Sequence, residues 1–182
     1  LMRYLSSAAA HAGNLVSRIP GANLVAVADV ILEAAEKLAD DLQIPAAFQD
    51  YRRIMEDKTI DAVLVCSSTE THADMVITAA SVGKHVFCEK PIDHHLGRVD
   101  IVLSAVEQAG VKLQVGFNRR FDPDFRRVRD VVDHGDIGEP HILRITSRDP
   151  EPPSMTYIKD SGGMFLDMTI HDFDMARFLI DS

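Results

Sequence analysis

The stretch that decides the fold is Ala62–Lys90, AVLVCSSTETHADMVITAASVGKHVFCEK. Two short apolar runs, Ala62–Cys66 and His85–Cys88, lie on either side of Thr71–Val82, a longer segment with helical period. Strand, helix and strand in this order are typical of a parallel sheet with crossover helices on its faces. Gly83 supports a helix end just before it, because glycine tolerates the positive φ that closes a last helical turn.

The same alternation continues on both sides of this unit. Further strands are predicted at Leu24–Ala28 and Leu113–Phe117, with a weaker one near Phe48. Amphipathic helices are predicted in the segments between and beyond these strands: a helix containing His11–Ile19, then Leu32–Leu42, Asp50–Asp57, Leu96–Ala109 and Pro123–His134. The sequence therefore predicts an α/β fold with a doubly wound parallel sheet.

A second domain is expected to begin after this alternation ends. Pro140–Arg148 alternates between its two faces and is predicted to be a strand that opens a second sheet. Prolines then interrupt the chain, and Gly162–Ile180 resumes as a helix. We therefore predict a nucleotide-binding domain over residues 1–118 and the start of an α+β substrate domain over residues 119–182.

Composition narrows the classes of partner. The 182 residues are 46% hydrophobic and 26% charged, which is typical of a globular protein, and the net charge of -9 argues against a nucleic-acid binder. A small-molecule ligand fits better. No apolar run reaches the roughly 18 residues that span a bilayer, and Leu1–Ala10 lacks the features of a signal peptide. Cys66 and Cys88 lie in apolar runs as buried thiols, so we expect a reducing compartment, the cytoplasm.

Polar residues after the predicted strands indicate a dinucleotide site. Asp29 ends the second strand of such a sheet, where a carboxylate accepts hydrogen bonds from the adenosine ribose of NAD and repels the 2'-phosphate of NADP. The alternative is that Asp29 only caps the next helix. Residues 66–72, CSSTETH, follow the next strand, and their hydroxyl groups either bond a dinucleotide or cap the following helix, as we expect of Thr71.

The glycine-rich phosphate loop is missing. Arg3, Leu5 and Ala8 stand where its glycines fall, and only Ala8 is an acceptable substitute, since the backbone must turn tightly and approach the pyrophosphate. Too little chain precedes these residues for a first strand, so the sheet is predicted to lack it. Losing two or three charge-assisted bonds of about 1.5–3 kcal/mol each removes most of a micromolar affinity. We expect weak or no NAD binding by this chain.

Two segments carry residues suited to alcohol oxidation. Residues 86–91, VFCEKP, place Lys90 at the carboxyl end of a strand, and Pro91 biases it toward an extended backbone. The alternative is an ordinary solvated lysine. In residues 162–174, GGMFLDMTIHDFD, helical spacing places Asp167, His171 and Asp174 on one side, among apolar neighbours.

His171 suits the role of base in such a site, because its ordinary pKa lies near neutral pH. Asp167 or Lys90 would orient the substrate hydroxyl. A metal site that includes Asp172 is a weaker alternative, because no second histidine lies at a matching spacing. The remaining alternative is that His171 is a core histidine whose ring is hydrogen-bonded within the protein and has no catalytic role.

Three motifs together resemble the glucose-fructose oxidoreductase and inositol dehydrogenase family: residues 87–91, FCEKP, residues 115–122, VGFNRRFD, and residues 163–174. The resemblance runs from about His11 to the last residue and implies a Rossmann-like fold, NAD as cofactor and hydride transfer from a ring carbon of myo-inositol to give the ketone. By position it implies Lys90, Asp167 and His171 as the catalytic group, His171 being the acid/base. Asp149 and Asp174 match polyol-contacting positions. The implied cofactor contacts are Asp29, Ser67, Ser68, Thr69, His72, Glu89, Lys90 and Arg120.

The departures from the family pattern are at both ends. The family begins with a strand and a glycine loop, and continues past Ser182 into an open sheet that builds the oligomer, so we expect this chain to be a piece of a longer, homo-oligomeric enzyme. Two other functions remain open. One is a sugar or amino-sugar dehydrogenase that uses the same lysine and histidine, and the other is a catalytically silent binding or interaction module, which the missing glycines favour.

Overall fold

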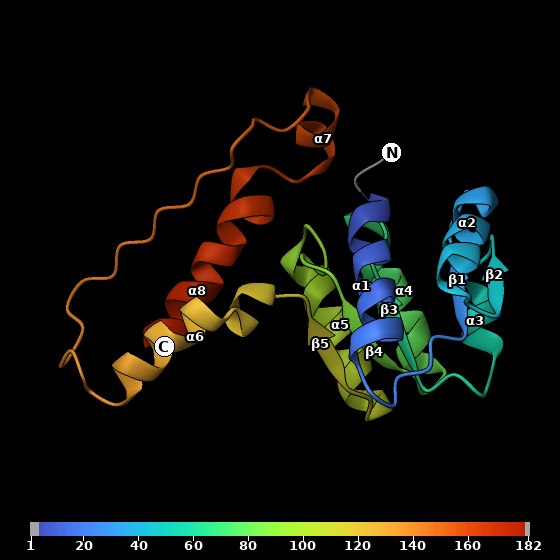
Figure 1. Ribbon diagram of the computed structural model, residues 1–182, viewed down its shortest axis with the longest axis horizontal. Helices are drawn as coiled ribbons and strands as arrows, with labels where there is room; N and C mark the ends of the chain where they lie inside the picture. Colours follow the sequence, from blue (N-terminus) through green and yellow to red (C-terminus); the bar gives the residue numbers. More distant parts are fainter. Residues whose placement is uncertain (1–3, 181–182) are drawn as a thin grey trace. The chain divides into compact units, whose positions relative to one another are not determined.

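The computed structural model describes residues 4–180, which form two compact units divided between Gln114 and Val115. In the first unit, helices and strands alternate in the predicted manner (Figure 1). The order is α1 (Tyr4–Arg18), β1 (Ala26–Ala28), α2 (Leu32–Leu42), β2 (Ala46–Phe48), α3 (Arg52–Glu56), β3 (Ala62–Val65), α4 (Thr69–Ser81), β4 (His85–Cys88), α5 (Leu96–Ala109) and β5 (Leu113–Val115).

The predicted α/β fold with parallel strands is confirmed, but the strands form two separate sheets. β1 pairs with β2 in parallel, with Ala26 opposite Ala46. β3 pairs with β4 in parallel, with Val65 opposite Cys88, and β5 lies on the other side of β4. No ladder joins β1 to β3 among residues 4–180. In a doubly wound sheet the first strand runs at this position.

The core of the first unit surrounds β3 and β4. Alternate residues of the two strands are buried, among them Val63, Val65, Val86 and Cys88, and they pack against the buried faces of α4 and α5. Helix α5 ends at Gly110, whose φ of 65° supplies the left-handed cap that other residues adopt at a cost. The carboxyl ends of β3 and β4 are thereby fixed side by side, which places the segments that follow them at one edge of the sheet.

The second unit is helical in its described part. It contains a short 3-10 turn, η1 (Asn118–Phe121), then α6 (Pro123–Asp133), α7 (Met155–Asp160), a π-helical turn η2 (Phe165–Thr169) and α8 (Ile170–Ile180). Helix α6 begins where the sequence directs it: Asp122 accepts hydrogen bonds from the backbone N–H groups of Asp124 and Phe125, and Pro123 occupies the first turn. α8 packs against α6 and η2.

One prediction for the second unit is wrong, and another needs a change of detail. Pro140–Arg148 forms no strand and is extended coil, because no other strand of the described second unit lies alongside to complete a ladder; the side chain of Ile142 is 90% exposed. The helix expected over Gly162–Ile180 is present from Met164 to Ile180, and it includes the π-helical turn η2. Asp167 lies in that wider turn, so the regular four-residue spacing to His171 does not hold.

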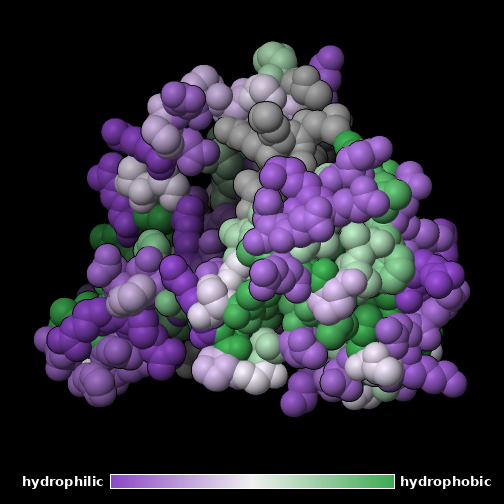
Figure 2. Space-filling model, turned by 45° about the vertical axis from the view of Figure 1, so that its right-hand side comes forward, coloured by the Kyte–Doolittle hydropathy of each residue, from purple (hydrophilic) through white to green (hydrophobic). Residues whose placement is uncertain are grey.

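Apolar side chains also reach the surface of each unit. Val30 and Leu96 in the first unit, and Ile142, Phe165 and Phe173 in the second, are more than half exposed. Figure 2 shows hydrophobic groups, in green, between hydrophilic ones on the face that it displays. In the described part of the chain, no helix is both long and apolar enough to cross a membrane.

Candidate active site

Lys90 lies directly after β4, at the carboxyl edge of the first unit's sheet, where its sequence context predicts it. Its backbone N–H donates to Oε2 of Glu89 at 3.3 Å, and the peptide bond to Pro91 is cis. Glu89 in turn is joined to the sheet, because its own N–H donates to the carbonyl oxygen of Val65 at 2.9 Å. The lysine backbone is therefore held by the Glu89 side chain, and Glu89 is held to the end of β3 by a main-chain bond.

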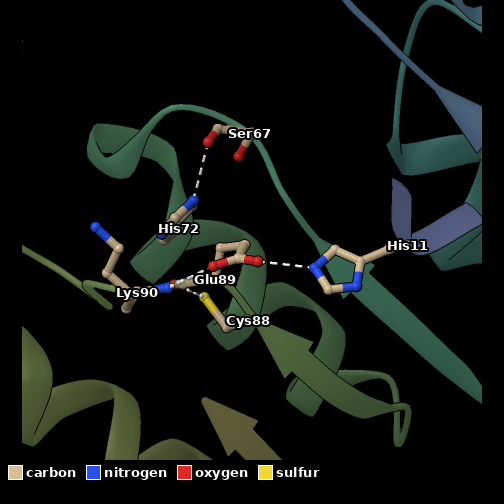
Figure 3. A network of polar contacts seen from close by, with 6 residues as sticks. All are labelled: His11, Ser67, His72, Cys88, Glu89 and Lys90. Atoms are coloured by element: carbon tan, nitrogen blue, oxygen red, sulfur yellow. Dashed lines mark hydrogen bonds and ion pairs between the residues drawn. The ribbon is translucent and has the colours of Figure 1, made fainter. Parts of the chain in front are cut away.

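No pattern in the sequence indicated that Glu89 pairs with a residue on α1. Nε2 of His11 lies 2.7 Å from Oε1 of Glu89 (Figure 3). The His11 ring also meets Phe87 edge to face, with centroids 5.0 Å apart. The two polar side chains are 31% and 23% exposed, so the contact is partly screened from water. They are separated by 78 residues, and no local pattern relates positions so far apart.

His72 is the most buried of the predicted cofactor contacts. It is 2% exposed, and its ring lies between two main-chain carbonyls: Nδ1 is 2.8 Å from the oxygen of Pro91, and Nε2 is 3.0 Å from the oxygen of Ser67. Both polar atoms of the ring are therefore taken up inside the first unit. Direct contact with a dinucleotide stays a prediction, and the geometry favours an indirect role.

The remaining predicted cofactor contacts of the first unit lie on the segments after β1 and β3. Asp29 follows β1, and its Oδ1 accepts the backbone N–H of Ile31 at 2.8 Å. Asp29 therefore binds a backbone N–H just before α2, as a capping residue would. The residue that directly precedes α2 is nevertheless Ile31 and not Asp29. Further lone pairs of the carboxylate are not used by this bond, so a ribose hydroxyl is chemically compatible with the same side chain.

The hydroxyl-rich segment after β3 is held by its own contacts. Ser67 Oγ and Thr71 Oγ1 are 2.6 Å apart, and Thr71 Oγ1 donates to the carbonyl oxygen of Ser68 at 2.8 Å. Helix α4 begins at Thr69, with Ser68 as the residue before it. The expectation that Thr71 caps this helix is wrong, because Thr71 lies inside the first turn and its hydroxyl bonds back to Ser68.

The two cysteines beside this edge are free thiols. Burial, with a smaller contribution from the charge of Glu89, raises the pKa of Cys66 to about 12. Burial also raises the pKa of Cys88 to about 12, with Cys66 and Glu89 adding to the effect. Both side chains therefore remain protonated at neutral pH and act as small apolar groups.

The glycine positions predicted to be missing lie in regular helix. Leu5 and Ala8 are part of α1, whereas Arg3 lies outside the described residues. Both residues are helical and do not form the tight loop that glycines would make at these positions. The first unit thus offers acceptors for a nucleoside and a lysine at the sheet edge, without a phosphate loop in its described part.

In the second unit, Asp167 is anchored by a residue that the sequence did not single out. The hydroxyl of Tyr157 on α7 donates to Oδ1 of Asp167 at 2.7 Å. His171, in the first turn of α8, meets Phe117 edge to face with ring centroids 6.4 Å apart. An aromatic wall on the histidine and a hydroxyl on the aspartate restrict the rotamers of both candidate catalytic groups.

Two neighbouring arginines of η1 bind two aspartates of α8. Arg119 Nη1 donates to Oδ1 of Asp172 at 2.6 Å, and Ser147 Oγ donates to the same oxygen at 2.5 Å. Arg120 binds Asp174 through a fork, with Nε–Oδ2 at 2.8 Å and Nη2–Oδ1 at 2.6 Å. These two pairs hold the first turns of α8 against η1.

The charges and hydrogen bonds of this network favour the ionised form of Asp172. Burial alone would raise the pKa of Asp172, but hydrogen bonds from Ser147 and Arg119 and the charge of Arg119 hold it below its ordinary value. The hydrogen bonds to Asp174 raise the pKa of Arg120 against the opposing effect of burial. Asp174 and Arg120, predicted as separate substrate and cofactor contacts, are thus brought together as one ion pair.

The other predictions for the second unit have simpler outcomes. Asp149 lies in exposed coil, and its contact with the polyol stays a prediction. Within the described residues, no group of three His, Cys, Asp or Glu side chains gathers in a metal-binding arrangement, and Asp172 is used by Arg119 and Ser147. Three residues that hold aspartates of this unit were not singled out from the sequence: Tyr157, Arg119 and Ser147. The only pattern that pointed to any of them is the pair of adjacent arginines, Arg119 and Arg120.

Parallel strands with polar residues at their carboxyl edge define the class of the first unit, a Rossmann-like nucleotide-binding fold. The chain belongs to the GFO/IDH/MocA oxidoreductase family. Residues 5–117 match the model described as "Oxidoreductase family, NAD-binding Rossmann fold", and residues 125–182 match the "GFO/IDH/MocA C-terminal domain". The family predicted from the three motifs is therefore confirmed.

Its relatives include characterised inositol enzymes. The chain is 50% identical over 170 residues to the myo-inositol 2-dehydrogenase of Thermotoga maritima, covering 93% of this chain and 51% of that protein. It is 52% identical over 165 residues to the inositol 2-dehydrogenase of Rhizobium meliloti, covering 91% of this chain and 49% of that one. The chain therefore spans about half the length of the curated relatives that it matches.

A solved structure gives the same likeness. The scyllo-inositol dehydrogenase of Lactobacillus casei, crystallised with bound cofactor NAD(H) and scyllo-inositol, matches with a TM-score of 0.86 at 33% identity. The match covers 94% of this chain and 52% of that one.

Proposed function

We propose that this chain is part of an NAD-dependent inositol 2-dehydrogenase, an oxidoreductase that converts a ring hydroxyl of myo-inositol or a related polyol to the ketone. The observation that carries the proposal is about 50% identity, over nearly the whole chain, to two enzymes of that name. The roles of Lys90, Asp167 and His171 as the catalytic group are part of the proposal. So are a cytoplasmic location and a homo-oligomeric parent protein.

The residues fit NAD in part. Asp29 presents a carboxylate after β1 that suits a ribose with two free hydroxyls and disfavours a 2'-phosphate. Lys90 lies at the sheet edge, where ligands of open α/β sheets bind. The pyrophosphate finds no glycine loop in the described α1. When bound, NAD supplies the acceptor for the hydride that leaves the ring carbon.

The chain's own residues would handle the proton. As the hydride leaves, the hydroxyl proton must also leave, and an imidazole is a suitable acceptor near neutral pH. His171 takes the proton in this proposal, while the Asp167 carboxylate, held by Tyr157, accepts a hydrogen bond from the polyol and orients it. The Lys90 ammonium stabilises the negative charge that develops on the oxygen. The proposal requires Lys90 and His171 to reach one substrate.

The test joins this chain to the remaining N- and C-terminal parts of the Thermotoga maritima relative. The hybrid protein is mixed with NAD and myo-inositol, and reduced nicotinamide is followed by absorbance. Lys90→Ala and His171→Ala should each abolish turnover, whereas the exposed His141→Ala should not. A hybrid that binds NAD and folds normally but keeps its rate after both alanine substitutions would overturn the assignment. A panel of sugars and amino sugars distinguishes the substrate.

The chain by itself is tested for NAD binding by calorimetric titration. We expect no binding at micromolar concentrations, because the bonds to pyrophosphate are lost. Micromolar affinity of this chain for NAD would show that the glycine loop is not needed, and would contradict that part of the reasoning.

A further inference from the structure

The backbone around Lys90 is held from two sides by side chains that the proposed chemistry does not use. On one side, Glu89 uses Oε2 for the Lys90 N–H and Oε1 for His11. On the other side, the carbonyl of Pro91 faces His72 at 2.8 Å. Figure 3 shows His72, Glu89 and Lys90 close together, with His11 reaching Glu89 from the right.

The second contact of His72 reaches a different segment. Its Nε2 faces the carbonyl oxygen of Ser67 at 3.0 Å, and Ser67 begins the hydroxyl-rich turn that leads into α4. One ring therefore lies between the turn after β3 and the Lys90–Pro91 segment after β4. The imidazole is 2% exposed, so water does not compete for either nitrogen.

We propose that His72 is a positioning residue that ties the Ser67 turn to the Lys90–Pro91 segment, so that the two segments keep one relative geometry. Carbonyl oxygens only accept hydrogen bonds, so each contact needs a proton on the facing ring nitrogen. A doubly protonated ring donates to both carbonyls at once, and a neutral ring donates to one at a time. The importance of this tie for catalysis rests on the proposed function; the tie itself does not.

The inference explains why a buried histidine occupies this place. A leucine of similar size would fill the space but leave the carbonyls of Ser67 and Pro91 without a donor, which is unfavourable in a buried position. An asparagine or a glutamine side chain supplies a donor on one side only. The amide nitrogen of asparagine lies where Nδ1 lies in histidine, and that of glutamine approximates Nε2.

This difference gives a test that a purely space-filling role would not pass. The ¹³C chemical shifts of the Ser67 and Pro91 carbonyls are measured by NMR in the wild-type chain and in His72→Asn, His72→Gln and His72→Ala. In His72→Asn we expect the Pro91 carbonyl to keep its wild-type chemical shift and the Ser67 carbonyl to change. In His72→Gln we expect the Ser67 carbonyl to keep its wild-type shift and the Pro91 carbonyl to change. His72→Ala should change both. The Ile60 carbonyl, which accepts from Lys84, should stay constant in all variants.

Amide exchange measures the positioning itself. The N–H groups of Glu89 and Lys90 should exchange about tenfold faster in His72→Ala and at nearly the wild-type rate in His72→Asn, because that variant keeps the bond next to Lys90. His85→Asn, at the opposite end of β4, is the matched control. If His72→Ala does not fold, the asparagine and glutamine variants still decide the question.

Two outcomes overturn the proposal: both carbonyl shifts stay at their wild-type values in His72→Asn, or the asparagine and glutamine variants change the two carbonyls alike. Neither readout needs turnover or bound NAD. Failure of the tie and failure of the dehydrogenase proposal are therefore seen in separate experiments.

Discussion

Removing Arg120 should destabilise the second unit more than removing its partner Asp174. The guanidinium forms three contacts with the carboxylate, at 2.6, 2.8 and 3.0 Å, so the geometry of the fork is nearly ideal. The two ends of the pair differ in their access to water: the Arg120 side chain is 40% exposed and that of Asp174 is 9% exposed. The unequal exposure sets the magnitude of each substitution.

In Arg120→Met the carboxylate of Asp174 stays in a nearly dry place without its guanidinium. Breaking a fully buried pair in this way costs about 3–5 kcal/mol, and the partial exposure of Arg120 reduces the expected loss to about 2–4 kcal/mol. In Asp174→Asn the guanidinium can be hydrated by water and can still donate to the amide oxygen. We therefore expect the opening free energy to fall by about 1–2 kcal/mol. Arg120→Lys keeps the charge but loses the fork, and should fall between the two.

The assay is native-state hydrogen exchange of the amides of α8, because a chain with two compact units need not unfold in one step. Arg126 and Asp130 on α6 provide the matched control: their contact is 3.4 Å and both side chains are well exposed, so Arg126→Met should change the opening free energy by less than about 0.5 kcal/mol. The reasoning is refuted if Asp174→Asn costs as much as Arg120→Met, or if both have effects as small as the control.

Three further predictions concern other parts of the chain. The pKa of Asp172 is held below its ordinary value of 3.8, so its ion pair stabilises the second unit above that pH and is lost as the pH falls through the folded-state pKa. Ser147→Ala should therefore weaken the acid dependence of amide exchange in α8. A pH profile that is the same in this variant and in the wild type would contradict the prediction. Since the pKa values of Cys66 and Cys88 are raised to about 12, iodoacetamide at pH 8 should alkylate the native chain at least about tenfold more slowly than the urea-unfolded chain, and equal rates by mass spectrometry would argue against buried thiols. Lys84 is 4% exposed and donates to the carbonyls of Asp57 and Ile60, so Lys84→Met should cost the first unit about 2–4 kcal/mol in amide exchange of β4, whereas the exposed Lys58→Met should cost less than about 0.5 kcal/mol.

The sequence predicted the first unit well because its signals are local. Helices α2 and α5 and strand β4 have the predicted bounds, since hydrophobic period and punctuation by glycine act within a few residues. Strand ends were less predictable: Leu24–Ala28 shortens to Ala26–Ala28 because a ladder needs a partner at every position. The same requirement explains why the alternating Pro140–Arg148 segment is coil.

The candidate site was predictable in its residue types but not in its contacts. Lys90 follows a strand as expected, because its place depends only on the strand before it. The pairing of Arg120 with Asp174 spans 54 residues, and that of His11 with Glu89 spans 78. Such contacts depend on how separate elements pack, and no local pattern contains that information. His72 illustrates the limit, since its sequence context indicates a helix start and not the two carbonyls that its ring meets.

The division of the first unit's sheet has a consequence for the residue proposed to select the cofactor. Asp29 follows β1, a strand of three residues whose described ladder joins it only to the equally short β2, and neither strand contributes to the main apolar cluster around β3 and β4. Cooperative subunits of a fold open in the order of their local stability, and the β1–β2 layer should be the first to open. Discrimination between NAD and its phosphorylated form would thus depend on the least persistent layer of this unit.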